Sequence, residues 1–146
     1  RNLIKKKRIN IKKNAFLKKE LIEPTKIYVN EVIRLIENNL LNGCANITGG
    51  GLADNIERII PNKFCAEIDL SKIKPSKIFC WLKKNNISDK EMLKTFNCSV
   101  GFCLIINPRD LEKVKKYFNN NYKPYVIGKI SKGKNKIKLN EKINWI

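Results

Sequence analysis

The chain has 146 residues, which suit one domain with its own core, and 42% of them are hydrophobic, which excludes a disordered charged arm. Its longest uninterrupted apolar run, residues 102–106, is far shorter than the roughly 20 residues that a membrane-spanning helix requires. The formal net charge is +18, but lysine far outnumbers arginine, and a codon bias towards A and T explains the abundant Lys, Asn and Ile more simply than a nucleic-acid partner does.

The first part of the chain predicts a basic lead segment followed by a strand and a helix. Residues 1–20 alternate lysine pairs with Ile and Leu and contain no turn glycine, which indicates a frayed helix end and a basic connector. Residues 25–29 follow Pro24 and are rich in β-branched and aromatic types, which favour a strand. Asn30 can then cap a helix over residues 31–39, whose apolar positions recur at helical spacing.

The middle of the chain predicts a second strand, a glycine corner and a second helix. Residues 44–48 form a short stretch that leads into three consecutive glycines. Residues 52–60 continue as a helix that Pro61 closes, and residues 64–70 alternate in polarity as a strand does. This order places the glycines between the end of a strand and the start of a helix.

Two further short helices are predicted after this strand. Pro75, followed by a serine, is typical of a helix start, and the apolar spacing continues to Leu82. Ser88 and Glu91 have the spacing of a capping box, which predicts a helix ending near Phe96. A serine that precedes a polar turn by chance is the alternative interpretation of this pattern.

The last third of the chain predicts three strands and one helix. Residues 100–106 form a buried strand, and residues 108–118 form an amphipathic helix with proline in its first turn. Residues 125–130 form another strand. The lysine-rich residues 136–139 form an edge strand.

Together these elements predict an α+β fold, an α/β sandwich in which helices pack on a sheet. The sheet, of about five or six strands, is mixed because the last strands can pair with each other through a turn. One domain accounts for residues 1–146, with its core over residues 21–140 and the basic lead over residues 1–20. We expect it to fold alone, with an exposed apolar patch where the rest of a longer parent chain packs.

The cysteines predict reduced thiols rather than a metal site or disulfides. Their number is odd, none forms a Cys-x-x-Cys pair, and the chain has no histidine. Most lie inside apolar runs, as buried thiols of a cytoplasmic protein do. Without histidine, any chemistry depends on phosphate binding, carboxylates, amides or backbone groups. The five positions are Cys44, Cys65, Cys80, Cys98 and Cys103.

The sequence ITGGGL is the strongest candidate for a binding site. Glycines adopt positive φ without steric cost, so the successive N–H groups of Gly49, Gly50 and Gly51 can turn towards one anion at a helix start, and Thr48 can add a hydroxyl. No Gly-Lys-Ser/Thr follows, which excludes a Walker P-loop, and the spacing differs from GxGxxG. The alternative is that the glycines only allow the strand and the helix to pack closely.

Four motifs in order establish a family resemblance. They are LIEPTKIYV, ANITGGGLADNIERIIP, KTFNCSVGF and YVIGKI, and they cover roughly residues 21–131. This arrangement resembles the C-terminal domain of aminoimidazole ribonucleotide synthetase, also called phosphoribosylformylglycinamidine cyclo-ligase. The family pattern reads close to EPTRIYV, HITGGGLxENxPRxLP, TFNMGxGM and YVIGEI.

The chain departs from this family pattern in places. Asn46 stands where the family usually has histidine, and an amide keeps hydrogen bonding but loses the proton chemistry of an imidazole. The substitution weakens an expectation of catalysis more than an expectation of binding. Four further positions differ from the family pattern: Lys26 replaces arginine, Asp54 replaces glutamate, Glu57 replaces proline and Cys98 replaces methionine. Three positions match it directly, and these are Asn55, Arg58 and Pro61.

The resemblance implies an ATP-dependent ring closure in purine synthesis. Family enzymes phosphorylate the formyl oxygen of formylglycinamidine ribonucleotide, and the amidine nitrogen attacks the activated carbon to close the imidazole. In the family, ATP and Mg are bound mainly by an N-terminal domain that residues 1–146 do not include, and that domain also forms the core of a homodimer. The resemblance also implies a three-layer α/β/α sandwich for the C-terminal domain.

On this resemblance the chain supplies the substrate side of the site and is inactive in isolation. No residue is assigned a catalytic role or a metal ion, and neither a nucleic acid nor a membrane is expected as a partner. The residues expected near the substrate and its phosphate are Asn46, Thr48, Gly49, Gly50, Gly51, Asn55 and Asn97.

Two alternatives stay open from the sequence. A basic nucleic-acid-binding domain would use the lysine-rich face with Tyr117, Tyr122 and Trp145, although no RNA-binding signature is present. A degenerate family member would keep the fold and lose turnover because of Asn46. Independently of both, the positive charge favours weak attraction to anionic partners, phosphorylated small molecules included.

Overall fold

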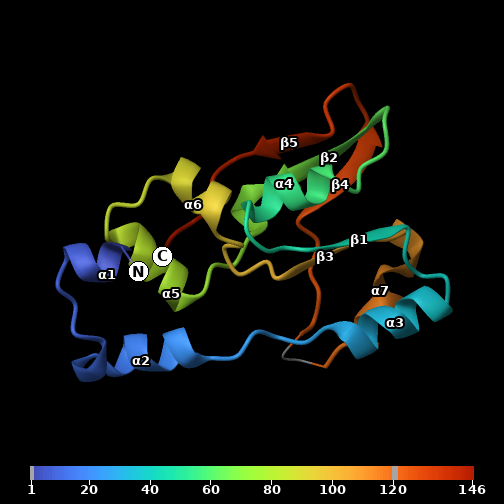
Figure 1. The fold of residues 1–146 in the computed structure, drawn as a ribbon. Helices are drawn as coiled ribbons and strands as arrows, with labels where there is room; N and C mark the ends of the chain where they lie inside the picture. The colour runs from blue at the N-terminus through green and yellow to red at the C-terminus, as the bar shows by residue number, and fades with distance from the viewer. Residues whose placement is uncertain (1, 120–121) are drawn as a thin grey trace.

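The computed structural model describes residues 2–119 and 122–146 as an arrangement of short helices and five strands (Figure 1). Among the described helices, none is long and apolar enough to cross a membrane. The mixture confirms the predicted α+β class. The α-helices are α1 (Asn2–Lys6), α2 (Ala15–Ile22), α3 (Val29–Glu37), α4 (Gly51–Glu57), α5 (Lys77–Lys84), α6 (Asp89–Thr95) and α7 (Leu111–Lys115). The 3₁₀ helices are η1 (Ile11–Lys13), η2 (Leu70–Lys72) and η3 (Pro108–Asp110). The strands are β1 (Gly43–Asn46), β2 (Phe64–Asp69), β3 (Phe102–Ile105), β4 (Gly128–Lys132) and β5 (Ile137–Asn140).

The five described strands form two sheets instead of the single sheet that the sequence predicts. β1 pairs antiparallel with β3, and β2 lies between β4, which is antiparallel to it, and β5, which is parallel. The second sheet is mixed, as predicted, but β4 and β5 flank β2 and do not pair with each other across their turn. β2 takes the middle because it carries the most buried positions, Ala66 and Ile68, whereas Ile130 and Leu139 on its neighbours are partly exposed, as edge strands are.

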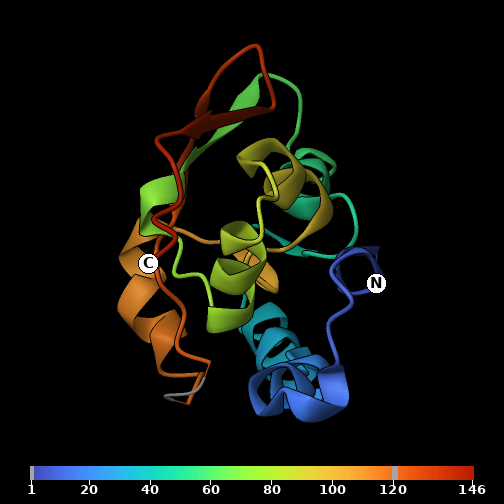
Figure 2. The same ribbon diagram turned by 90° about the vertical axis from the view of Figure 1, so that its left-hand side faces the viewer.

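The main core lies on one face of the second sheet. Ala66 and Ile68 of β2 pack there with Leu52 and Ile56 of α4 and with Met92 of α6. Figure 2 shows α4 and α6 together on the same side of β2 and β5. A second, smaller apolar cluster joins α3 to α7. The glycine corner starts α4, so its position is set by the main core.

The other face of the second sheet is polar. Glu67, Lys129, Ser131 and Lys138 share this face because they occupy paired positions on three strands. The Ser131 hydroxyl donates a hydrogen bond to the Glu67 carboxylate, and together with the nearby Lys129 and Lys138 ammonium groups it lowers the pKa of Glu67. A helical layer over this face, which the three-layer arrangement requires, stays a prediction.

The strand predicted over residues 25–29 is wrong. Residues 23–28 have no regular structure, most of them are exposed, and α3 begins at Val29. β-branched residues favour a strand only where another strand offers pairing, and no described strand pairs with this segment. Asn30 is not the cap either, because the helix begins before it and the preceding Tyr28 makes no side-chain capping bond.

The lead segment is more ordered than a frayed connector. It contains α1, η1 and α2, and the Asn14 side chain caps α2 by accepting a hydrogen bond from the Leu17 N–H at 3.0 Å. Leu17 is fully buried. A capped helix with a buried leucine belongs to the folded domain.

Several predicted elements are present with shifted ends. β4 begins at Gly128 instead of Tyr125. A Cβ at Gly128 would lie 2.2 Å from the Glu67 carbonyl oxygen, so glycine allows the close approach of this strand to β2. α4 ends at Glu57 instead of Ile60, and the helix predicted over residues 108–118 is divided into η3 and α7. β-propensity and apolar spacing locate such elements but do not define their ends.

The capping box at α6 is half confirmed. The Ser88 side chain accepts a hydrogen bond from the Glu91 N–H at 3.2 Å. The Glu91 carboxylate, however, accepts a hydrogen bond from the Thr95 hydroxyl instead of turning back to the cap. The serine therefore carries the capping interaction alone.

Ser88→Ala is expected to lower the free energy of unfolding by about 1 kcal/mol, because the Glu91 N–H loses its acceptor. Ser76→Ala is the matched control, since Ser76 precedes α5 in the same extended conformation but makes no side-chain capping bond. Urea unfolding of the two variants measures the difference. Equal losses in both would show that the cap at α6 contributes nothing.

Candidate functional site

The glycine corner joins β1 to α4 through a tight turn. The Ile47 N–H donates to the Gly101 carbonyl at 2.9 Å, which ties the end of β1 to the residue before β3. The Gly51 N–H donates to the Thr48 carbonyl at 3.2 Å and closes the turn. Gly50 and Gly51 have φ values of 94° and 69°. The turn needs glycine at both positions because other residues rarely adopt this left-handed conformation.

The outer glycines of the corner have different surroundings. A Cβ on Gly51 would lie 1.9 Å from the Leu93 carbonyl oxygen and 3.3 Å from that of Phe96. The backbone of α4 therefore lies directly against the backbone at the end of α6, with no room for a side chain between them. Gly49 is exposed, and no atom lies within 4 Å of its Cβ position. The close-packing interpretation of the glycines is confirmed at Gly51, and anion binding by the corner stays a prediction. Gly51 serves close packing, and Gly49 leaves the backbone accessible to a ligand.

Asn55 holds the corner from the inside. Its side chain is 7% exposed, and its amide donates to the Gly51 carbonyl at 2.7 Å and to the Gly49 carbonyl at 3.4 Å. A buried amide that donates to the backbone of a turn fixes the shape of that turn. The structure thus brings Asn55 together with the glycines, and a direct contact between Asn55 and a ligand stays a prediction.

Asn46 and Thr48 lie at the open edge of the corner. Both are exposed, and Asn46 is the last residue of β1, opposite Phe102 of β3. Because strand side chains alternate, Asn46 points away from the face that buries Ala45. An exposed amide and an exposed hydroxyl beside Gly49 can both donate hydrogen bonds to an anionic ligand.

Tyr28 is a neighbour of the corner that sequence reasoning missed. A Cβ on Gly101 would lie 2.3 Å from the Tyr28 phenol oxygen, and the Tyr28 ring lies 5.4 Å from that of Phe102 and 6.1 Å from that of Tyr122. Burial, with a smaller contribution from Tyr122, raises the pKa of Tyr28, so the phenol stays protonated at neutral pH. The sequence signal that could have pointed to Tyr28 is its position in the family motif EPTKIYV.

Asn97 lies in the turn that links α6 to β3. Its side chain accepts a hydrogen bond from the Ser99 N–H at 3.1 Å, and its carbonyl accepts one from the Val100 N–H at 2.8 Å. Cys98 and Ser99 have φ values of 47° and 77° although neither is glycine, and the family pattern has glycine at the second of them. The Ser99 hydroxyl accepts a hydrogen bond from the Ser76 N–H at 2.7 Å, which offsets part of the conformational cost.

Three of the four family motifs meet at this place. Tyr28 comes from the first, the glycine corner from the second, and Phe96, Asn97 and Gly101 come from the third. The fourth motif, YVIGKI, contains Gly128 and lies on the second sheet beside β2. Residues that are far apart in the chain thus form one local structure around the exposed backbone of the corner.

The cysteines do not add chemistry to this site. All five are free thiols, and Cys65, Cys80 and Cys98 are buried while Cys44 and Cys103 are partly so. Burial, with a smaller contribution from Asp89, raises the pKa of Cys98 to about 11, so the residue beside the corner is an unreactive thiol at neutral pH. In the described part of the chain, no three side chains of metal-binding type lie together.

The three aromatic residues of the nucleic-acid alternative are partly buried and contact other side chains of the molecule. The Arg34 guanidinium lies 5.1 Å from the ring centre of Tyr117, and Tyr122 packs edge-on against the partly buried Tyr28. The Trp145 N–H donates to the Asp89 carboxylate at 2.9 Å. These contacts argue against the three rings acting as a platform on which bases stack.

Comparison with known proteins agrees with the four motifs. Residues 2–140 match the family described as AIR synthase related protein, C-terminal domain. The chain belongs to this family. Similar proteins include the phosphoribosylformylglycinamidine cyclo-ligases of Ligilactobacillus salivarius, 41% identical over 78% of the chain, and of Streptococcus pneumoniae serotype 4, 42% identical over 82%. The trifunctional purine biosynthetic protein adenosine-3 of Chironomus tentans is 43% identical over 76% of the chain.

The AIR synthase related domain is one part of these relatives. The chain covers 34% and 35% of the two bacterial cyclo-ligases and 8% of the trifunctional protein. Most of the length of each relative therefore lies outside the shared domain.

Gly51→Ala is expected to lower the free energy of unfolding by about 2–3 kcal/mol, because the new methyl group meets the Leu93 carbonyl and the left-handed φ disfavours alanine. Gly49→Ala is the matched control and should change it by less than about 0.5 kcal/mol, since its Cβ position is open. Thermal and urea unfolding of the two variants provide the comparison. A stable Gly51→Ala variant would contradict the close packing of α4 on α6.

Proposed function

We propose that the chain is the substrate-side domain of an ATP-dependent cyclo-ligase that converts formylglycinamidine ribonucleotide to aminoimidazole ribonucleotide in de novo purine biosynthesis. In this reaction ATP phosphorylates the formyl oxygen, the amidine nitrogen attacks the activated carbon, and ADP and phosphate leave. Membership of the AIR synthase related family and relatives that carry the cyclo-ligase name support the proposal. We place the reaction in the cytoplasm, where the five free thiols remain reduced.

The observation that carries the proposal is the exposed backbone at the meeting point of three family motifs. On this proposal, the N–H groups of Gly49 and Gly50 and the Thr48 hydroxyl bind the ribose phosphate of the substrate. Gly51 shapes the turn instead, because its own N–H donates to Thr48. Asn46 contacts the substrate from the end of β1, at the open edge of the corner.

Asn55 and Asn97 act in this proposal mainly as positioning residues. The Asn55 amide donates to the carbonyls of the corner, and the Asn97 side chain accepts from the Ser99 N–H in the neighbouring turn. Holding the N–H groups of a turn in place lets them bind a phosphate without reorganisation. The two asparagines would therefore affect substrate affinity through the geometry of the corner.

ATP and Mg belong, on this proposal, mainly to a second domain. The described residues bring no three carboxylate or thiol groups together, and Mg is commonly held by one or two carboxylates together with the phosphate oxygens of a nucleotide. ATP with its Mg supplies the phosphoryl group and the charge neutralisation of the transfer. The present residues bind and orient the phosphorylated substrate at the corner.

An apolar stripe on α3 suits contact with that second domain. Val29, Ile33 and Ile36 are 56%, 47% and 55% exposed and follow one another at helical spacing, whereas Val32 and Leu35 of the same helix are buried. The cyclo-ligase relatives are about three times as long as the matched part, and we propose that the ATP-binding domain of the parent covers this stripe. The parent would form a homodimer through the same domain.

The direct test is a cyclo-ligase assay with the full-length parent. We expect aminoimidazole formation that requires ATP, Mg and formylglycinamidine ribonucleotide, and none from the chain alone. Gly49→Ala in the parent should raise the KM for the ribonucleotide about tenfold with little change in kcat, because a methyl group on the corner displaces one charge-assisted hydrogen bond to the phosphate.

Gly43→Ala is the control for this variant. It lies at the other end of β1, and its Cβ would meet Ile105 at 3.5 Å, an ordinary contact. We expect its KM to be unchanged. A parent that forms no aminoimidazole would refute the enzymatic proposal, and a Gly49→Ala variant with unchanged KM would refute the phosphate contact.

The degenerate alternative depends on Asn46, which stands where the family usually has histidine. If an imidazole is needed for the chemical step, Asn46→His in the parent should raise kcat about tenfold or more and leave the free energy of unfolding nearly unchanged, because the position is exposed. The pH dependence of kcat would then show a new group titrating near pH 6–7. An unchanged kcat would indicate that the amide suffices at this position.

A further inference from the structure

A basic hollow lies at the tip of the second sheet, at the opposite end of α4 from the glycine corner. It has a volume of about 690 Å³. Residues 58–63 lead from α4 to this tip, where the turn between β4 and β5 meets the start of β2. The lining residues are Asn62, Lys63, Lys132, Gly133, Lys134 and Lys136.

Backbone hydrogen bonds fix the segments that carry these lysines. The Gly133 N–H donates to the Lys63 carbonyl at 3.0 Å, and the Ala66 N–H donates to the Lys136 carbonyl at 2.9 Å. A Cβ on Gly133 would lie 2.8 Å from the Cβ of Cys65, so glycine allows the turn to sit directly on β2. The lysines therefore extend from a closely packed backbone.

The hollow concentrates positive charge without compensation. Its lining contains no acidic residue, and in the part of the chain that the structure describes none of its four lysines forms an ion pair. Glu67 lines an adjoining hollow that shares Lys132 and Lys134 with this one, and its carboxylate is engaged by Ser131 and Lys129. Several like charges around one concave surface raise the local concentration of anions, and they repel one another until an anion binds.

We propose that this hollow binds a small molecule with several linked phosphates, such as a nucleoside triphosphate or inorganic tripolyphosphate. The ammonium groups supply many donors, as phosphate-binding lysines do, and the open shape of the hollow leaves a flexible phosphate chain accessible to all of them. No aromatic or apolar side chain lines the hollow to hold a base, so recognition depends on the phosphate chain and not on the nucleoside. This site is separate from the proposed substrate site and does not depend on it.

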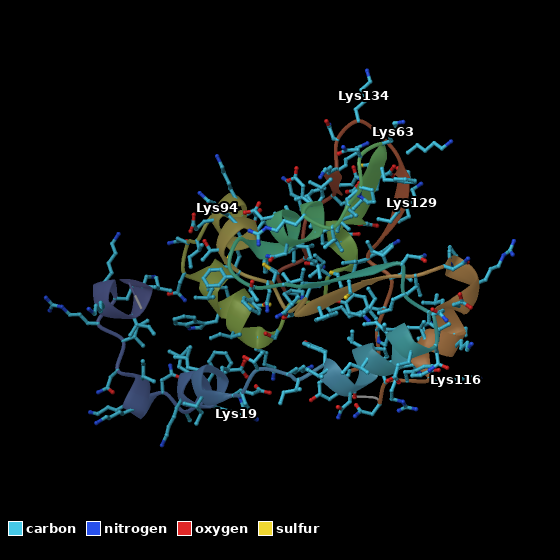
Figure 3. The ribbon with its side chains drawn as sticks, turned by 45° about the vertical axis from the view of Figure 1, so that its right-hand side comes forward. Lys19, Lys63, Lys94, Lys116, Lys129 and Lys134 are labelled. Carbon is cyan, nitrogen blue, oxygen red and sulfur yellow. The ribbon has the colours of Figure 1, made fainter. Side chains whose placement is uncertain are left out.

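Figure 3 shows where suitable variants lie. Lys63 and Lys134 extend from the tip of the second sheet, while Lys19, Lys94 and Lys116 lie on or next to α2, α6 and α7, in other parts of the molecule. The tip variant is Lys63→Gln/Lys132→Gln/Lys134→Gln. The control is Lys19→Gln/Lys94→Gln/Lys116→Gln, which removes the same number of charges.

Isothermal titration of the 146-residue chain with tripolyphosphate, ATP and AMP tests the proposal. We expect tripolyphosphate and ATP to bind with similar affinity, AMP to bind at least about tenfold more weakly, and added salt to weaken all three. The tip variant should lose at least about tenfold in affinity for ATP, and the control should stay within about twofold. Purine-synthesis activity has no part in this measurement, so its result is independent of the cyclo-ligase proposal.

Three outcomes would overturn the proposal. Equal losses in the tip and control variants would mean that binding follows net charge alone. Equal affinities for AMP and ATP would remove the requirement for linked phosphates. Tighter binding of a single-stranded oligonucleotide than of tripolyphosphate, abolished in the tip variant, would assign the surface to nucleic acid instead.

Discussion

Gly51 brings the first turn of α4 against the end of α6, where a Cβ would lie 1.9 Å from the Leu93 carbonyl oxygen. Because the two helices approach this closely, Leu52 can join Met92 in the main core, and the residues before Gly51 must leave α4 through a left-handed turn. Asn55 then reaches back from α4 to the carbonyls of that turn. The shape of the candidate site thus follows from one missing side chain.

The same contact separates residues that build the corner from residues that face solvent. The buried amide of Asn55 donates its hydrogen bonds to the backbone of the turn, whereas Thr48 and Gly49 are exposed to solvent. Fixed donors beside an open surface can bind an anion with little loss of conformational freedom. Pairing of β1 with β3 places Phe102 of β3 opposite Asn46 at this edge.

The excess of lysine has different consequences in different parts of the molecule. Lys83 and Lys115 form ion pairs with Asp89 and Glu112, which neutralises their charge locally. At the tip of the second sheet, backbone packing around Gly133 gathers lysines that have no such partners in the described residues. Packing of the backbone can therefore gather on one surface lysines that the composition spreads along the whole chain.

The sequence by itself determined the α+β class, the position of β2 along the chain, and the location of the glycine corner between a strand and a helix. These features depend on local periodicity and on motifs that follow one another in order. Only the tertiary structure decided that residues 25–29 are no strand, that β2 lies between β4 and β5, and that Tyr28 fills the space beside Gly101. These outcomes depend on which segments find partners and on how closely two backbones approach. Such contacts join residues far apart in the chain, and neither propensity nor spacing records them.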